Sequence, residues 1–432
     1  MKKLPKGPSL FSALGDVPAI RRDIIGVFQG YFDQYGDDIC FSFIGKKTIM
    51  SRSSEFHNYI LKTKSENYKK SFAYDLMKPI FGEGLLVAHG DHWRENRQRM
   101  NSAFGPEQLK LYAPKIEKLT LDLLLQWSVG SSPNIHQDLI MLTLGIIGDC
   151  LFGRDIRTYG PHVSQAMLTI MNRVEGQILN PLSVPLWIPV QKNKKYLQSI
   201  ETINQISEQL IDVVLAHKKV SDNEKTLLAR LLPVGEVTPE IKKNLRDQIM
   251  TLLITGHDTS ANLLTFALQI LANDKNLYQE LLQEIEKNPD ADPALLTSFL
   301  NEVMRLYPPV WMASRTAINE DHDGQFPIEK GMLVALVPYY LHRHPEYWKE
   351  AEQFNAKRFM SEYPAHAFMP FGAGPRACVA MSLGMLEMKI ILKKILLELE
   401  FESLSPIKVK PTLTLKPDGP VPMKFKRRKR GA

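Results

Sequence analysis

Apolar residues recur at three- and four-residue spacing along much of the chain, which is the period of an amphipathic helix. The longest such pattern, residues 241–272, contains no proline and predicts a helix about 48 Å long at the usual rise per residue. The same spacing predicts helices over residues 106–127, 196–219, 275–287, 295–306 and 381–399. Strand patterns are few and short, over residues 39–44, 47–51 and 332–337. These patterns predict a mainly α protein with a small β-sheet region.

The longest predicted helix carries a polar cluster at its centre, residues 255–260 (TGHDTS). Gly256 lowers helix stability, so its position indicates that another group approaches the backbone closely. Thr259 or Ser260 can donate a hydrogen bond to the carbonyl four residues earlier. The simplest interpretation is a solvated polar face. The alternative is a proton relay, because a carboxylate such as Asp258 beside a hydroxyl can pass protons.

A glycine-rich run, residues 371–380 (FGAGPRACVA), surrounds Cys378. Two glycines and a proline impose an irregular backbone that leaves amide N–H groups able to point at one sulfur. Such donors, with the start of a following helix, favour a thiolate over a thiol. Arg376 adds a cation suited to an anionic group on a cofactor. The alternative is a buried structural cysteine that follows a loop.

These ten residues match the pattern Phe-x-x-Gly-x-Arg-x-Cys-x-Gly except at Ala380, and the run resembles the haem-binding loop of cytochromes P450. Residues 302–305 (EVMR) are similar to the Glu-x-x-Arg motif of that family. Residues 354–359 (FNAKRF) are similar to its Phe-x-Pro-x-Arg-Phe motif, with Ala356 in place of proline. The polar cluster resembles the family's oxygen-activation motif, with Thr255 where alanine or glycine is usual. The resemblance covers most of the chain and implies the single-domain cytochrome P450 fold.

The resemblance also implies a cofactor, haem b (iron protoporphyrin IX), and the residues that hold it. Cys378 is expected to be the metal ligand and to push electron density onto the iron. The other expected cofactor-binding residues are Trp93, Arg97, Arg315, Arg376 and Phe371. Trp93 and Arg97 lie four residues apart, so they project from one face of a helix.

The same resemblance assigns roles to the remaining motifs. Asp258 and Thr259 are the expected catalytic residues, an acid and an alcohol that supply protons during O2 reduction. His257 is expected to face away from them. The expected network of buried charges, which holds the cysteine loop's segment in place, comprises Glu302, Arg305 and Arg358. The expected pocket wall comprises Ile254, Thr255 and residues 310–312.

The implied activity is that of a monooxygenase that inserts one atom of O2 into an apolar substrate. No flavin or iron–sulfur motif follows Cys378, so the electrons of NAD(P)H are expected from a separate ferredoxin, flavodoxin or reductase. Residues 81–93 and 368–371 resemble the fatty-acid hydroxylase class, but these are scaffold segments, so a fatty acid, a terpene or a steroid remains open as the substrate. Apolar residues over 178–190 indicate a hydrophobic access route for the substrate. The alternatives are a peroxide-driven or isomerising P450-type enzyme, or a non-catalytic haem-binding protein.

Composition adds an expectation about location. The chain of 432 residues has only three cysteines, which suits a reducing compartment and predicts a cytoplasmic protein. No apolar stretch near the first residue is long enough for a transmembrane anchor, so a soluble, bacterial-style member of the family is expected. The expected organisation is a lead-in with a first helix (1–38), a haem domain (39–423) and a basic tail (424–432).

The charge of the chain, +7 at pH 7, favours an acidic redox partner. The candidate docking residues lie just beyond the cysteine loop: Lys389, Lys393 and Lys394. The terminal basic run, residues 424–430, is typical of a solvated tail and is also compatible with an anionic membrane. Nucleic acid is not expected as a partner, because no recognition fold accompanies that run.

Overall fold

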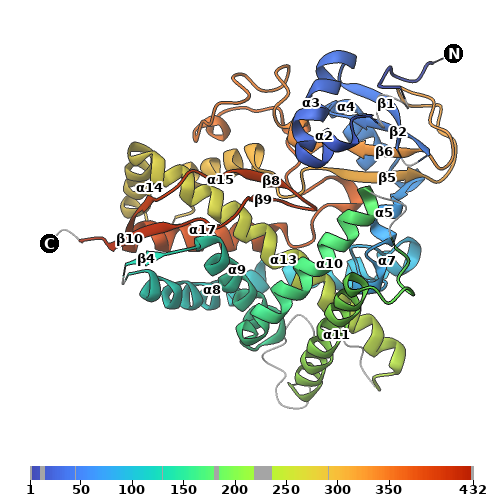
Figure 1. Cartoon of the computed structure of the whole chain (residues 1–432). Helices are drawn as coiled ribbons and strands as arrows, with labels where there is room; N and C mark the ends of the chain where they lie inside the picture. The colour runs from blue at the N-terminus through green and yellow to red at the C-terminus, as the bar shows by residue number, and fades with distance from the viewer. Residues whose placement is uncertain are drawn as a thin grey trace. The chain divides into compact units, whose positions relative to one another are not determined.

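The computed structural model describes residues 2–9, 15–43, 45–128, 130–179, 184–217, 236–289 and 291–429 (Figure 1). Parts of four sequence predictions lie outside these residues: the end of the strand over 39–44, the end of the helix over 196–219, the middle of the apolar run over 178–190 and the end of the basic run. Within the described residues helices predominate, and the strands form small sheets. The expectation of a mainly α protein is therefore confirmed.

The helices that the sequence predicted begin and end within about five residues of the expected positions, as far as the described residues show. The longer α-helices are α3 (Ile24–Tyr35), α7 (Gly90–Asn101), α8 (Pro106–Trp127), α9 (Ile135–Ile147), α10 (Gly160–Leu179), α11 (Gln191–His217), α13 (Pro239–Asn273), α14 (Lys275–Lys287), α15 (Ala294–Leu306) and α17 (Met381–Glu398). The shorter ones are α2 (Val17–Arg22), α4 (Ser54–Asn58), α5 (Phe72–Asp75), α6 (Lys78–Phe81) and α16 (Pro338–Leu341).

Contacts within the chain divide it into two compact units. The first, which we call the sheet unit, comprises Met1–Asp75, Ser298–Cys378 and Lys410–Lys416. The second, which we call the helical unit, comprises Leu76–Thr297, Val379–Val409 and Pro417–Ala432. Cys378 thus lies in the sheet unit, whereas the polar cluster of α13 lies in the helical unit.

The sheet unit is built on five strands in the order β1-β2-β6-β5-β3. Their bounds are β1 (Asp38–Phe43), β2 (Lys46–Ser51), β3 (Tyr68–Lys70), β5 (Ala313–Ala317) and β6 (Leu333–Leu336). The predicted hairpin is confirmed, since β1 and β2 pair antiparallel, and β2 pairs parallel with β6. Neighbouring side chains point to opposite faces of a strand. Ile49 accordingly belongs to one apolar cluster and Met50 to another, so the sheet has a core on each face.

The helical unit is organised around α13, whose 35 residues span about 52 Å. Pro239 lies in its first turn and the Thr238 hydroxyl accepts a hydrogen bond from the Ile241 amide, so the start of the helix is capped. Along the middle of the helix most side chains are buried, and α9 and α17 pack against it (Figure 1). The polar cluster therefore lies in an apolar setting.

The two ends of the chain differ from the expected organisation. Among the described residues before β1 there are two helices, α2 and α3, where the sequence predicted one. The basic run begins as a strand rather than a tail: β10 (Met423–Arg427) pairs with β4 (Ser131–Ser132) and β7 (Leu399–Ser403) in a three-stranded sheet. A further pair is formed by β8 (Val409–Pro411) and β9 (Leu415–Pro417).

One helical segment of the described chain, Ile135–Phe152, has the length and apolar composition that a membrane span needs. It is 67% buried inside the protein, and the core helix of a soluble protein has the same properties.

Candidate functional site

The cysteine loop is a tight turn stabilised by its own backbone. The Cys378 amide donates a hydrogen bond of 2.8 Å to the Phe371 carbonyl, and a single 3-10 turn, η8 (Gly374–Arg376), lies between them. Gly374 has φ +67°, and a Cβ atom there would lie 1.8 Å from the Leu61 carbonyl oxygen. Only glycine fits, so this residue sets the loop against the π-helical turn η1 (Tyr59–Thr63). Cys378 is exposed and Phe371 is half-buried.

Three basic residues of the sheet unit gather near the cysteine loop. Arg315 on β5 stands opposite Lys70 on β3 in the antiparallel register, and Arg315 is only 7% exposed. Lys70 is half-buried, and the pKa of its amine is well below the usual range, mainly because the group is desolvated and further because Arg315 and Arg376 lie nearby. The structure therefore groups two of the predicted cofactor-binding arginines. It adds Lys70, which the sequence interpretation missed because the pairing of β3 with β5 joins segments about 245 residues apart.

The predicted network of buried charges is confirmed. Arg305 makes two hydrogen bonds of 2.8 Å to the Glu302 carboxylate, and both side chains have no exposed surface. Arg358 donates from Nε to the same carboxylate at 3.1 Å. The guanidinium of Arg305 also donates to the carbonyls of His342 and Ala351. This network ties α15 to the segment that leads into the cysteine loop.

Within the polar cluster of α13 the partly exposed positions alternate with buried ones. Thr255, Gly256, Asp258 and Thr259 are half-buried, whereas the adjacent His257 and Ser260 are buried. Asp258 and Thr259 are consecutive, so their side chains point about 100° apart around α13, and both positions are half-buried. The Thr259 hydroxyl donates to the Thr255 carbonyl at 3.1 Å, which confirms the predicted bond to the preceding turn.

Asp258 is connected to α9 through a chain of hydrogen bonds. Asn262, which is fully buried, donates from Nδ2 to the Asp258 carboxylate at 3.1 Å. The amide oxygen of Asn262 lies 2.7 Å from Nε2 of His136. Since that oxygen only accepts, His136 must donate from Nε2, which fixes its tautomer. Asn262 lies four residues beyond Asp258, so its position on the same face was visible in the sequence, whereas the contact with His136 was not.

The opposite face of α13 meets a buried acid on α17. Ser260 Oγ lies 3.3 Å from a carboxylate oxygen of Glu387, which is 4% exposed. Burial raises the pKa of Glu387 to about 8, although the contact with Ser260 lowers it. The carboxyl group is therefore protonated at neutral pH. No motif pointed to this residue.

The structure also tests the predictions made for His257 and Gly256 of α13. His257 is buried, away from the half-buried positions, as expected: its Nδ1 lies 2.6 Å from the Leu253 carbonyl. The close approach expected at Gly256 comes from a core side chain, because a Cβ there would lie 2.7 Å from Cδ1 of Ile147 on α9.

The expected pocket wall is only partly supported. Ile254 is buried on α13 and Val310 is exposed. Trp311 is a core residue of the sheet unit: it is 4% exposed, packs in the cluster around Met50 and donates from its indole to the Thr412 carbonyl at 2.6 Å. An apolar residue after Tyr307-Pro308-Pro309 looks the same in sequence whether it lines a pocket or a core.

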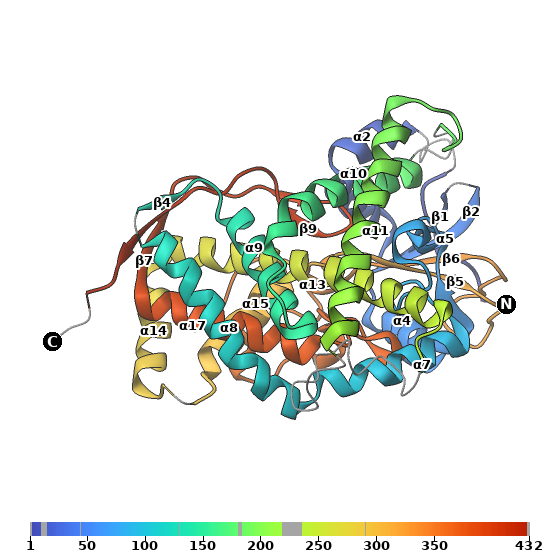
Figure 2. The same cartoon turned by 90° about the horizontal axis from the view of Figure 1, so that it is seen from below.

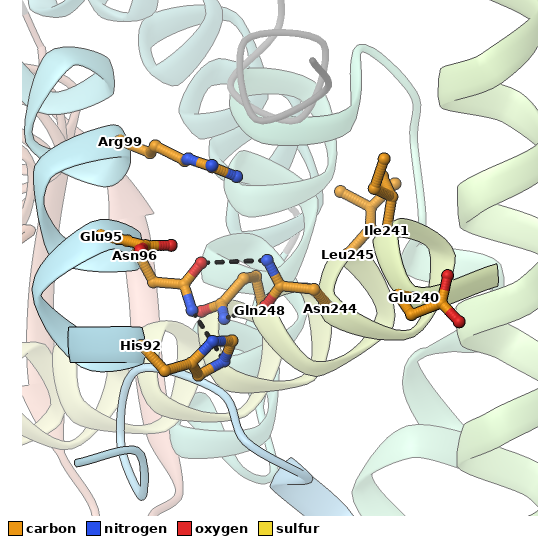
Figure 3. A pocket seen from close by; sticks show the side chains of 9 residues that line it. All are labelled: His92, Glu95, Asn96, Arg99, Glu240, Ile241, Asn244, Leu245 and Gln248. Atoms are coloured by element: carbon orange, nitrogen blue, oxygen red, sulfur yellow. Dashed lines mark hydrogen bonds between the residues drawn. The ribbon is translucent and has the colours of Figure 1, made fainter. Parts of the chain in front are cut away.

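Trp93 and Arg97 both lie on α7 and are both half-buried. The other side of that helix borders a cavity of about 160 Å³ beside the start of α13 (Figure 3). The cavity is lined by His92, Glu95, Asn96, Arg99, Glu240, Ile241, Asn244, Leu245 and Gln248. Hydrogen bonds of 3.0 Å join His92 to Asn96, Asn96 to Asn244 and Asn244 to Gln248. The polar side chains of His92, Asn96, Asn244 and Gln248 are thus hydrogen-bonded to one another. None of the predicted site residues lines this cavity.

A family model described as Cytochrome P450 matches residues 5–425. The chain belongs to the cytochrome P450 family. Members of the family are haem-binding monooxygenases that use O2 and electrons from redox partners. The predicted family and fold are therefore confirmed.

Three relatives show how far this similarity extends. Protein LUTEIN DEFICIENT 5, chloroplastic, from Arabidopsis thaliana is 26% identical over 86% of this chain and 68% of that protein. Cytokinin hydroxylase from the same plant is 29% identical over 75% of this chain and 67% of that protein. Bifunctional cytochrome P450/NADPH--P450 reductase 1 from Bacillus subtilis is 28% identical over 82% of this chain, which spans only 36% of that relative.

The residues of this P450 fit the charges of a haem. The propionate groups of haem are anionic, and Arg315 and Arg376 provide the positive charge that such groups require, with Lys70 as a third basic residue beside them. The glycine at position 374 keeps the turn before Cys378 compact. Within the sheet unit, therefore, the same few segments bring an exposed cysteine sulfur and a set of basic residues together.

Proposed function

We propose that this P450 hydroxylates an apolar organic substrate, and that Cys378 holds the iron of haem b. The observation that carries the proposal is the cysteine loop together with its three neighbouring basic residues. Lys70, Arg315 and Arg376 would bind the propionates from the sheet unit, and Trp93 and Arg97 on α7 would supply further donors. Phe371 would pack beside the sulfur. When bound, the haem supplies the activation of O2.

Asp258 and Thr259 are proposed to deliver protons. Insertion of one oxygen atom into a C–H bond uses O2, two electrons and two protons, and it releases one molecule of water. The two side chains lie at consecutive half-buried positions of α13. Asn262 holds the Asp258 carboxylate, and the Thr255 carbonyl orients the Thr259 hydroxyl. A carboxylate and a hydroxyl fixed in this way can pass protons one after the other.

A separate redox partner is proposed to supply the electrons, and a cytoplasmic location is proposed from the three free cysteines. The lysines suggested for docking have other roles. Lys389 pairs with Asp292 at 2.8 Å, Lys394 pairs with Glu117 at 3.1 Å, and Lys393 binds the Pro289 carbonyl. The case for an acidic partner therefore rests on the net charge of +7. Recovery of the protein outside the cytoplasm in cell fractionation would contradict the proposed location.

The proposal is tested with Cys378→Ser, Cys40→Ser and Cys150→Ala. After reduction and addition of carbon monoxide, the unchanged protein and the last two variants should give the red-shifted absorption band typical of thiolate ligation. Cys378→Ser should lose it. Persistence of the band in Cys378→Ser would refute the assignment of the ligand. NAD(P)H should be consumed by the unchanged protein only after a reductase is added, and consumption without one would refute the separate partner.

A further inference from the structure

Three side-chain amides lie in a row between α7 and α13 (Figure 3). Asn96 of α7 is 3% exposed, and its Oδ1 accepts a hydrogen bond of 3.0 Å from Nδ2 of Asn244 on α13. Oδ1 of Asn244 accepts in turn from Nε2 of Gln248, which is 1% exposed. Oε1 of Gln248 accepts from the Leu85 amide at 3.0 Å. The amides therefore form one hydrogen-bonded chain that joins α7, α13 and the loop before α7.

The direction of each hydrogen bond in this amide chain is determined. A backbone N–H only donates, so Oε1 of Gln248 must accept from Leu85, and Nε2 must donate to Asn244. The same argument continues through Asn244 to Asn96, whose Nδ2 lies 3.0 Å from Nε2 of His92. Nε2 of His92 therefore accepts. The amide chain ends on a ring that can change its tautomer.

The loop before α7 is also fixed to α13 by the preceding residue of that helix. Asp247, which is 3% exposed, accepts a hydrogen bond of 2.8 Å from the Glu83 amide. Gly82 has φ +53°, and a Cβ atom there would lie 2.1 Å from the Asp247 carboxylate. A Cβ atom at Gly84 would lie 2.2 Å from the hydroxyl oxygen of Thr251. The loop is therefore held closely against α13, and α7 begins soon after it.

Packing alone does not hold α7 on this side, where it lies beside the start of α13 (Figure 2). The cavity of about 160 Å³ lies between the two helices, so close-packed side chains do not resist a rotation of α7 there. Asn96 lies next to Arg97 and three residues after Trp93. Its hydrogen bond to Asn244 therefore sets the direction in which these two residues project, since one residue corresponds to about 100° around a helix.

We propose that Asn96 and Asn244 are positioning residues for the binding of haem. They act through Trp93 and Arg97, the proposed donors of α7 to the propionates, so this inference rests on the proposed function. A donor that is held in place before the ligand arrives loses less conformational freedom on binding. When the amide chain is broken, α7 is free to turn toward the cavity and to carry both donors with it. No motif pointed to the two amides, because their contact joins positions 148 residues apart.

The test is the rate at which the haem-loaded protein releases haem to an excess of apomyoglobin. Asn96→Leu and Asn244→Leu keep a branched side chain that cannot hydrogen-bond, and each should raise the rate about tenfold. The double variant should be no faster than the faster single variant, because either change breaks the same hydrogen bond. Asn96→Asp should stay within about twofold of the unchanged protein, since one carboxylate oxygen accepts from Asn244 and His92 can donate to the other.

Asn193→Leu is the matched control. Asn193 is 1% exposed and donates two hydrogen bonds to backbone carbonyls between α10 and α11, so its bonds do not involve α7. This variant should lower the free energy of unfolding but release haem at the unchanged rate. An unchanged rate in Asn96→Leu, or an equal increase in Asn193→Leu or in Asn96→Asp, would overturn the proposal.

A variant at Arg97 separates this inference from the proposed function. Arg97→Gln should itself release haem faster, and Asn96→Leu should add much less to it than to the unchanged protein. A full additional increase would show that the amides do not act through this donor, and would overturn the inference alone. Unchanged release by Arg97→Gln would contradict both the assignment of the donor and the route proposed for the amides. The red-shifted carbon monoxide band should persist in all these variants, because Cys378 is unchanged.

Discussion

Thr259 and Asp258 are held by hydrogen bonds to residues on their own helix, within four positions along the chain. Because such contacts are local, helical spacing in the sequence was enough to predict the bond that the Thr259 hydroxyl makes to the preceding turn. The residues that support them from other elements, His136 and Glu387, could not be predicted. Their contacts join helices that are more than 120 residues apart.

At this scale Thr259→Ala is the most direct test of the proton relay. The variant should keep its haem, but lose the hydroxyl that stands next to Asp258. We expect product formed per NAD(P)H to fall about tenfold or more, with peroxide or water formed instead. Product and peroxide yields measure this outcome. Thr265→Ala is a matched control, since that buried hydroxyl makes the same type of bond, to the Ala261 carbonyl at 2.7 Å. An unchanged yield in Thr259→Ala, or an equal fall in the control, would exclude the role.

At the scale of whole elements, the sequence predicted those helices best that have one apolar face and clear ends. The bounds of α8 and α14 match the predictions, and Pro106 and the Asp274 cap explain why they begin where they do. In contrast, α9 was missed, because nine of its 13 residues are buried and it lacks a continuous polar face. The strands β4 and β10 were missed because two-residue and highly basic strands carry no alternating pattern.

Two glycines allow the cost of a left-handed backbone to be separated from the cost of a steric clash in the turn before Cys378. A left-handed backbone conformation costs a residue other than glycine about 1–2 kcal/mol. Gly374→Ala should lower the free energy of unfolding by more than that, because the added Cβ would lie 1.8 Å from the Leu61 carbonyl oxygen. Gly331→Ala is the control: φ is +84° there, and no atom lies within 4 Å of the added Cβ. Haem content and chemical denaturation should show a large loss for Gly374→Ala and a small one for Gly331→Ala. Equal losses would mean that the contact with Leu61 is unimportant.

For the whole molecule, burial of titratable groups sets the dependence of stability on pH. In the sheet unit, burial lowers the pKa of His57 to about 4 and that of His342 to about 3. Unfolded histidines bind protons below about pH 6.5, so stability should fall as the pH drops below that value. In the helical unit, the raised pKa of Glu387 acts in the opposite sense. The folded state holds a proton that the unfolded state has released, so stability should also fall as the pH rises toward 8.

These shifts predict a maximum of the unfolding free energy near pH 6.5, with a decrease of about 2 kcal/mol by pH 8 caused by Glu387. Glu387→Gln keeps a hydrogen-bonding group beside Ser260 but does not titrate. Chemical denaturation between pH 5.5 and 9 should therefore show that the variant loses less stability above pH 6.5. If the unfolding free energy of the two proteins changed with pH in the same way, the raised pKa assigned to Glu387 would be wrong.

The last strand of the chain has a practical consequence for protein engineering. β10 is the central strand of its sheet, Phe425 stacks on Trp127 with ring centroids 4.4 Å apart, and the Arg428 amide donates to the Glu398 carbonyl at 2.9 Å. Trimming the basic run to improve solubility would therefore remove the middle of a sheet and uncover an aromatic pair. Affinity tags, linkers or a grafted reductase should be joined only after Arg428, where the ordered backbone pairing of the strand has ended.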